Sequence, residues 1–229
     1  MRHVTVMSFT SSIGIMAIYV VDLLDIFFVS LLGQTEVAAA AGFASTLMFY
    51  VSAMNIGLSI AAGTLTAQYL GRHDLSSARD AAASSMIMAL CVGIVVPIAM
   101  LPFIPNMLAW LGASGEVAEL AEMYLWIVLP ASGLSGMSMV LVAALRSHGF
   151  AKWSMYPSLA GALVNLIFDP LLIFGLNMGL AGAATATVMA RVATFAVALY
   201  AAARLFEVIA KPRLDAIARY TREIIRFTL

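Results

Sequence analysis

Charged residues are scarce in this chain. Only 10% of its 229 residues are Asp, Glu, Lys or Arg, and the formal net charge is zero. A soluble domain of this length cannot cover its surface with so few charges. A neutral chain also offers no basic surface for a nucleic acid, so we expect no nucleic-acid partner. Cys91 is the one cysteine, which excludes a disulfide framework within the chain; we expect it to be a small, buried apolar residue.

Apolar residues are abundant and make up 63% of the chain. A helix needs about 20 of them to span a lipid bilayer. Six runs of sufficient length lie at about residues 5–32, 37–70, 79–101, 118–145, 154–175 and 180–203. We therefore predict an all-α membrane protein, with a bundle of six transmembrane helices in residues 1–206. The first run lacks a small-residue cleavage site, so we interpret it as a helix and not as a removed signal peptide.

Basic residues alternate between the predicted connections and give the topology. Between the helices or at their ends they are Arg2, Arg72, Arg79, Arg146, Lys152, Arg204, Lys211, Arg213, Arg219, Arg222 and Arg226. These positions fall before the first run, in every second connection, and after the last run, while the other three connections have none. Positive charge marks the cytoplasmic side, so both ends of the chain are predicted to be cytoplasmic. Arg191, inside the last run, is the exception.

Residues 207–229 differ from the rest of the chain. Lys211-Pro212 interrupts the helical pattern, and apolar residues then alternate with Arg and Glu. This pattern predicts an amphipathic helix on the cytoplasmic surface. We interpret the segment as a linker, after which a new apolar run could begin.

Asn165 and Asp169 stand out inside the fifth run. They are four residues apart, about one helical turn, so their side chains share one face. A carboxylate at membrane depth costs roughly 2.5–3.5 kcal/mol on insertion scales. A side chain kept there at such a cost is expected to bind an ion or a proton.

Two further polar side chains are predicted to lie at the same depth. Asp25 is eight residues before Gly33, and Thr187 is eight residues after Gly179; Asp169 is six residues before Gly175. At about 1.5 Å per residue, all three lie roughly 9–12 Å from the outer helix ends. Carboxylate, carboxamide and hydroxyl oxygens suit a hard cation such as Na⁺. Because neighbouring carboxylates repel each other, the same cluster could instead take up a proton.

Other interpretations of these residues remain open. Asn165 could form a hydrogen bond to a neighbouring helix, and Thr187 could donate to its own helix backbone. The two carboxylates could form a structural ion pair with Arg191.

A second polar pair is predicted one turn deeper. Asp22 precedes Asp25 by three residues, and Arg191 follows Thr187 by four. We expect Asp22 and Arg191 to form a salt bridge that neutralises two buried charges beneath the cation cluster.

Four stretches of the chain resemble the multidrug and toxic compound extrusion (MATE) family of transporters. Residues 24–33, LDIFFVSLLG, resemble the family's first helix. Residues 67–72, AQYLGR, resemble the end of its second helix, and residues 144–149, ALRSHG, resemble the turn between its fourth and fifth helices. Residues 165–187 resemble its fifth and sixth helices. The chain departs from many members in having Asp22 where they have Asn, and Thr10 near where they have Pro.

The resemblance implies a function and a site. The family is built of twelve helices in two six-helix lobes, and this chain corresponds to the N-terminal lobe. Members export amphipathic, often cationic compounds in exchange for Na⁺ or H⁺, so we expect a multidrug efflux antiporter and not an enzyme. In members whose N-lobe ion site is described, the ligands correspond to Asp25, Asn165, Asp169 and Thr187. The implied partners are a small-molecule substrate and a second lobe, and no cofactor beyond the coupling ion. The implied location is a bacterial inner membrane.

Three alternatives are weighed against this interpretation. A lipid-linked oligosaccharide flippase of the same superfamily should have more basic residues in its cavity, where Arg191 is the one candidate. A half-length fragment would not transport. An intramembrane aspartyl protease also needs two Asp residues, but its Gly-x-Gly-Asp pattern is missing at Phe168-Asp169-Pro170.

Overall fold

The computed structural model describes residues 27–205 together with Ser12, Met16, Val20, Leu23 and Tyr220. Within this part of the chain every regular element is helical. The α-helices are α2 (Thr35–Gly71), α3 (Leu75–Met100), α4 (Ile104–Trp110), α5 (Gly115–Val128), α6 (Ser132–Ser147), α7 (Ala151–Pro170) and α8 (Gly179–Arg204). The short 3₁₀ turns η1 (Leu101–Phe103) and η2 (Leu129–Ala131) and the π turn η3 (Leu171–Gly175) connect or extend them.

The predicted transmembrane helices are confirmed where the structure describes them. Five helical segments are long and apolar enough to cross a membrane: Thr35–Gly71, Leu75–Trp110, Gly115–Ser147, Ala151–Gly175 and Gly179–Arg204. They correspond to the second to sixth predicted runs, and most begin a few residues earlier. The first run lies largely outside the described residues, although residues 27–30 at its end are helical. The chain is therefore an all-α, multi-pass membrane protein.

One predicted span is not a continuous helix. Residues 118–145 were expected to form a single helix, but a 3₁₀ turn at Leu129–Ala131 separates α5 from α6. Pro130 lies at the centre of this turn, and its missing N–H removes one bond of the α-helical ladder. We call this turn the α5–α6 break.

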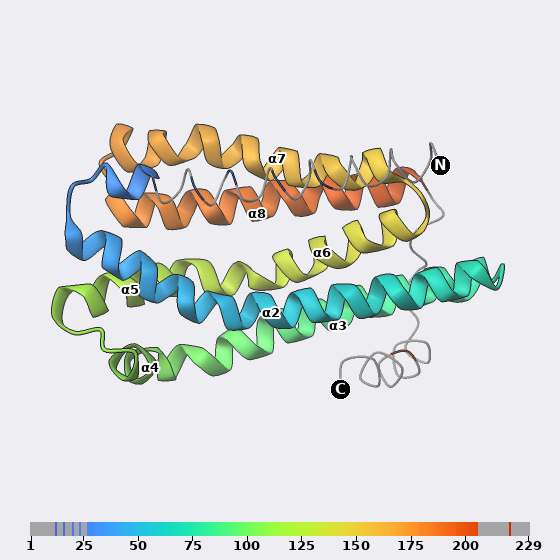
Figure 1. Ribbon diagram of the computed structural model, residues 1–229, viewed down its shortest axis with the longest axis horizontal. Coiled ribbons are helices and arrows are strands. Elements are labelled where there is room, and N and C mark those ends of the chain that lie inside the picture. Colours follow the sequence, from blue (N-terminus) through green and yellow to red (C-terminus); the bar gives the residue numbers. More distant parts are fainter. Residues whose placement is uncertain are drawn as a thin grey trace.

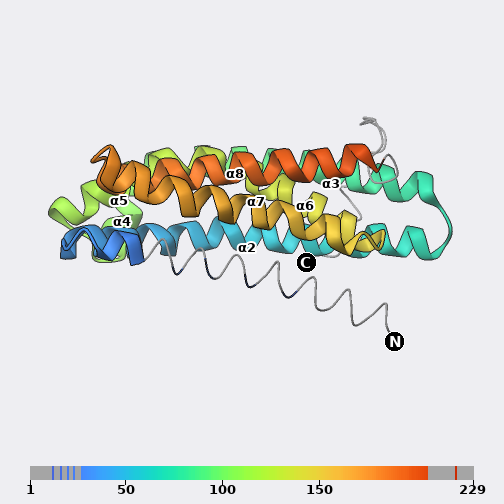
Figure 2. The ribbon, with the colours of Figure 1, turned by 90° about the horizontal axis from the view of Figure 1, so that it is seen from above.

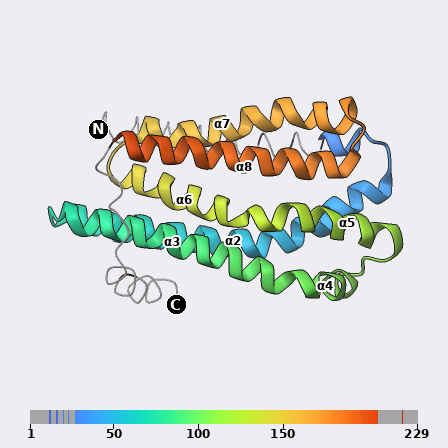
Figure 3. The ribbon, with the colours of Figure 1, turned by 180° about the vertical axis from the view of Figure 1, so that it is seen from behind.

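The broken helix lies between two helix pairs. Figure 1 shows α7 and α8 along one side of an elongated bundle and α2 and α3 along the other, with α5 and α6 between them. Figure 3 shows the same order from behind, and Figure 2 shows from above that the helices run along the length of the bundle. α6 packs against α2, α3, α7 and α8, so both pairs depend on its position.

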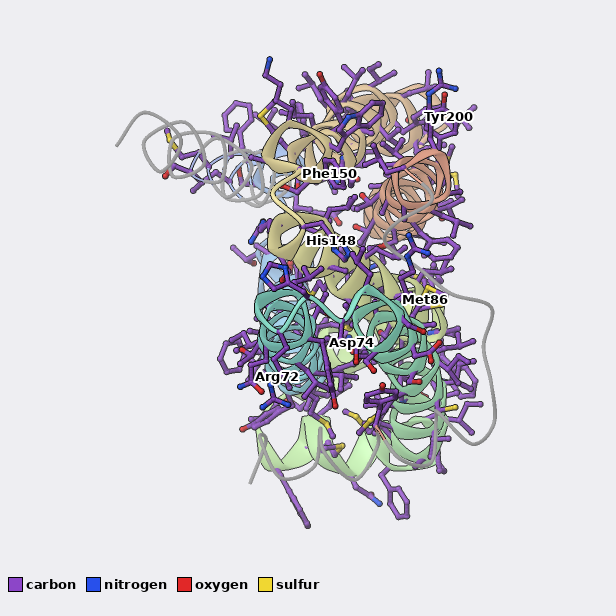
Figure 4. All side chains as sticks on the ribbon, turned by 90° about the vertical axis from the view of Figure 1, so that its right-hand side faces the viewer. Arg72, Asp74, Met86, His148, Phe150 and Tyr200 are labelled. Atoms are coloured by element: carbon purple, nitrogen blue, oxygen red, sulfur yellow. The ribbon has the colours of Figure 1, made fainter. Side chains whose placement is uncertain are left out.

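The basic turns gather at one end of the bundle. The α2–α3 turn and the α6–α7 turn lie at the right-hand end of Figure 1, where α8 also ends. Figure 4 views this end and shows Arg72 and Asp74 on the first turn and His148 and Phe150 on the second. The turns without Lys or Arg lie at the opposite end. This arrangement agrees with the alternation of charge along the sequence.

Cys91 corrects one expectation. It lies on the exposed surface of α3 and is not buried. Ile94, Val95 and Ile98 on the same helix are exposed as well. In a membrane helix the outer face contacts lipid and is as apolar as the core, so hydrophobicity alone does not separate the two faces.

The start of α3 is capped by a side chain. Asp74 precedes the helix, and its Oδ1 accepts a hydrogen bond of 3.0 Å from the backbone N–H of Ser77. An aspartate at this position satisfies an otherwise unpaired amide at the helix start and typically contributes about 1 kcal/mol.

We expect Asp74→Ala to lower the free energy of unfolding by about 1 kcal/mol because that amide loses its acceptor. Thermal unfolding of the purified protein in detergent measures the change. Asp74→Asn, which keeps an acceptor oxygen, should retain most of the stability; an equal loss in both variants would contradict the capping role.

Candidate ion-binding site

Asn165 and Asp169 lie on the inward face of α7. Their side chains are only 4% and 1% exposed, whereas Leu166 and Ile167 between them are 47% and 52% exposed. α7 thus turns its apolar side chains outward and its polar pair inward. This is the orientation expected when the outer face contacts lipid and the polar groups serve a function inside the bundle.

The α-helical part of α7 ends directly after Asp169. Pro170 has no N–H, so the carbonyl of Leu166 loses its helical partner. The amide of Leu171 donates to Phe168 O, and the chain then widens into the π turn η3. Short π turns within helices are frequent at functional sites. Here the widened turn adjoins the most buried carboxylate of the described residues.

Thr187 lies on α8 and is half-buried. Its hydroxyl donates to the carbonyl oxygen of Ala183, one turn earlier, at 3.0 Å. The alternative that this threonine bonds to its own helix is therefore realised. The bond does not remove Thr187 from consideration as a ligand, because it uses the hydroxyl proton and leaves the oxygen lone pairs available.

Close backbone contacts fix how α7 and α8 lie against each other. Near their shared turn, a Cβ on Gly182 would lie 2.8 Å from the carbonyl carbon of Leu172. Further along, a Cβ on Gly161 would collide with Oγ1 of Thr194. Small residues of this kind allow membrane helices to approach closely. The two helices are antiparallel neighbours between these points, as Figure 3 shows.

The register places Thr187 beside the polar pair. Between the two glycine contacts, each step forward along α8 corresponds to about one step back along α7. Thr187 is then level with about Ile167 or Phe168, between Asn165 and Asp169. Asp25, which was expected at the depth of Asp169 and Thr187, lies outside the described residues, so the complete cluster remains a prediction.

The two aspartates of the first run fall outside the described residues. Asp22 and Asp25 are therefore not placed, and their roles remain predictions. The nearest described contact is that of Phe28, whose ring lies edge-on to Phe174 of η3 with a centroid distance of 6.5 Å. The end of the first run thus lies against the π turn that follows Asp169.

Arg191 has partners that the sequence did not suggest. Its Nη1 donates to the carbonyl oxygen of Val128 at 2.9 Å and lies 3.4 Å from Oγ of Ser132. Both partners flank the α5–α6 break. The expected partner Asp22 lies outside the described residues, so that salt bridge remains a prediction. The contact with the α5–α6 break is an addition that pairing charges by depth does not provide.

The sequence of this chain matches a known family of membrane transport proteins. A family model described as MatE matches residues 10–171, which is more than half of the chain. The chain belongs to the MatE family. The "Multidrug export protein MepA" of Staphylococcus aureus is 30% identical over 183 residues, which cover 79% of this chain and 40% of that protein.

Solved structures of family members share the fold. A MOP superfamily transporter from Pyrococcus furiosus is 27% identical with a TM-score of 0.88, covering 99% of this chain and 51% of that one. The Vibrio cholerae transporter VcmN, in its bent form, has a TM-score of 0.90 at 20% identity; the match covers 97% of this chain and 51% of VcmN, and it bears on the fold alone. The chain spans about half the length of these solved relatives.

Proposed function

We propose that this chain forms one six-helix lobe of a secondary active antiporter that exports amphipathic, cationic compounds in exchange for Na⁺ or H⁺. The ion would bind at Asp25, Asn165, Asp169 and Thr187. The observation that carries the proposal is the buried pair on α7, with the half-buried hydroxyl of Thr187 at the same level on α8. The proposed location is a bacterial inner membrane, with both ends of the chain cytoplasmic.

The chemistry of the proposed site suits a small cation. Asp169 contributes carboxylate oxygens, Asn165 a carboxamide oxygen and Thr187 a hydroxyl oxygen, all of which are hard ligands. The Ala183 carbonyl lies 3.0 Å from that hydroxyl and adds a further oxygen to this wall. A proton on Asp25 or Asp169 could take the place of the cation, because it would also neutralise a negative charge inside the bundle.

Ion binding would drive export through a change in conformation. A ligand shifts an equilibrium between two states only by the difference in its affinity for them. An ion that enters from the outer end would favour the conformation in which the substrate has been released. The substrate would favour the conformation that binds it. The substrate-binding cleft would form between this lobe and a second six-helix lobe, which the same gene or another chain would provide.

The multidrug substrate class is supported by the name of a relative and by the contacts of Arg191. MepA is named a multidrug export protein. A flippase for lipid-linked oligosaccharides was expected to use basic residues, and Arg191 was the candidate. Its guanidinium is instead engaged with Val128 and Ser132.

Thr187→Ala tests the site with a close control. We expect the ion concentration for half-maximal export to rise about tenfold, the effect of losing roughly 1.4 kcal/mol of binding free energy. Thr185 is the matched control: it is also half-buried and donates to its own helix, at Ala181 O, but lies on another face of α8. Thr185→Ala should leave the half-maximal concentration unchanged.

The measurement is export from cells or vesicles containing the complete two-lobe transporter. A Na⁺ series at fixed pH and a pH series without Na⁺ together identify the coupling ion. An equal response of the two threonine variants would contradict the assignment of Thr187 as a ligand.

A further inference from the structure

Three helices, α2, α3 and α8, contact the α5–α6 break. Arg191 reaches it from α8, and Asn55 reaches it from α2, with Nδ2 lying 3.4 Å from the carbonyl oxygen of Ser132. On α3, a Cβ at Gly93 would collide with the backbone of Gly133 in the first turn of α6. The break is therefore the place where both helix pairs of the lobe are joined to the central helix.

The backbone bonding changes at the acceptor that Arg191 uses. In a continuous α-helix the amide of Ser132 would donate to the carbonyl of Val128. Here Ser132 N–H donates to Leu129 O in the 3₁₀ pattern, and the Val128 carbonyl accepts a bond of 2.9 Å from the guanidinium. A half-buried guanidinium without an acceptor is costly inside an apolar bundle. The Val128 carbonyl supplies that acceptor.

Asn55 is fitted closely into the same junction. It is 2% exposed, and a Cβ at Gly136 would lie 2.6 Å from its Oδ1. Only glycine at that position leaves room for the carboxamide. The polar contacts of α2 and α8 thus meet at one residue, Ser132: Asn55 contacts its carbonyl oxygen and Arg191 its hydroxyl.

We propose that Arg191 is a positioning residue for the cation site. Its hydrogen bonds to the α5–α6 break fix the rotation of α8 and its position along the bundle axis. Because Thr187 is one turn away on the same helix, these bonds also keep it level with Asn165 and Asp169. This inference rests on the proposed function. It goes beyond that function because it assigns the tuning of ion affinity to a residue that does not touch the ion, and to a backbone carbonyl of α5 at the α5–α6 break.

Two variants remove the hydrogen bond between Arg191 and Val128, one by changing its donor and one by changing the helix that carries its acceptor. Arg191→Met keeps a long apolar side chain but has no donor. Pro130→Ala restores an amide at residue 130, which favours a continuous helix in which Ser132 N–H takes the Val128 carbonyl. Pro130 is exposed, so its replacement leaves the core intact. Arg204→Met, at the exposed end of α8, and Pro102→Ala, in the exposed 3₁₀ turn η1, are the matched controls.

The readout is the ion concentration for half-maximal export by the complete transporter, measured beside the maximal rate and the substrate KM. We expect each variant to raise the half-maximal ion concentration about tenfold, with a substrate KM within about twofold of wild type. The double variant should be no worse than either single one, because both remove the same contact. The two controls should behave as wild type.

Several results would overturn the proposal. If the two effects multiply in the double variant, Arg191 acts through another partner, such as Asp22. If Asp169→Asn abolishes the ion dependence but Arg191→Met and Pro130→Ala leave it unchanged, the positioning role fails and the cation site stands. If ion dependence survives in Asp169→Asn, the cation site itself fails, and the positioning role fails with it. Should Arg191→Met not accumulate in the membrane, Pro130→Ala alone must show the tenfold shift.

Discussion

Asp169→Asn is expected to abolish drug export by a complete transporter that contains this lobe. The side chain is 1% exposed and lies beside the π turn, where a carboxylate is retained at a high cost in an apolar helix. Asparagine has nearly the same shape, so the fold should persist while the charge that attracts the ion is lost. The expected loss of export is at least about a hundredfold, as for a buried charge interaction of roughly 3 kcal/mol.

Drug resistance of cells and dye efflux from vesicles both measure this loss. Asp80→Asn is the control: Asp80 lies in the first turns of α3 at the inner end of the bundle and is half-buried. It should leave export unchanged. Unimpaired export by Asp169→Asn, with normal amounts of protein in the membrane, would contradict the proposed site.

Gly182→Leu is expected to destabilise the lobe more than any other single change considered. A Cβ at this position would lie 2.8–2.9 Å from backbone atoms of Leu172 and Ile173, which cannot move aside as a flexible side chain does. The substitution must push α8 away from the start of η3. Overpacking of this kind costs about 3 kcal/mol.

Gly42→Leu is the matched control for this prediction. Gly42 lies on the exposed face of α2, and a Cβ there would meet nothing within 4 Å. Thermal unfolding in detergent should show a clear loss for Gly182→Leu and little change for Gly42→Leu. Equal stability of both variants would contradict the close α7–α8 contact, and with it the register that places Thr187 beside Asn165 and Asp169.

The helices could be predicted from the sequence because the bilayer fixes their length and composition. Turn positions followed from glycine, proline and charge. The inward orientation of Asn165 and Asp169 was also foreseeable, because polar groups avoid lipid.

The parts that could not be predicted depend on backbone irregularity. Pro130 lies within an apolar run, and proline is tolerated in membrane helices, so hydropathy did not reveal the α5–α6 break. The predicted depth of Asp169 assumed the constant rise of an α-helix up to Gly175, whereas Leu171–Gly175 form a π turn. One described partner of Arg191 is a backbone carbonyl, which carries no sequence signal of its own.

The most direct test of the proposed site is the linkage between ion and drug binding in the purified two-lobe protein. Because an antiporter binds the two ligands in opposition, the coupling ion should weaken drug affinity, and the effect must be reciprocal at equilibrium. We predict that drug affinity of the wild type falls about tenfold on saturation with Na⁺ or protons. Asp169→Asn should bind the drug with an affinity that no longer depends on the ion. An undiminished ion dependence in Asp169→Asn would contradict the account.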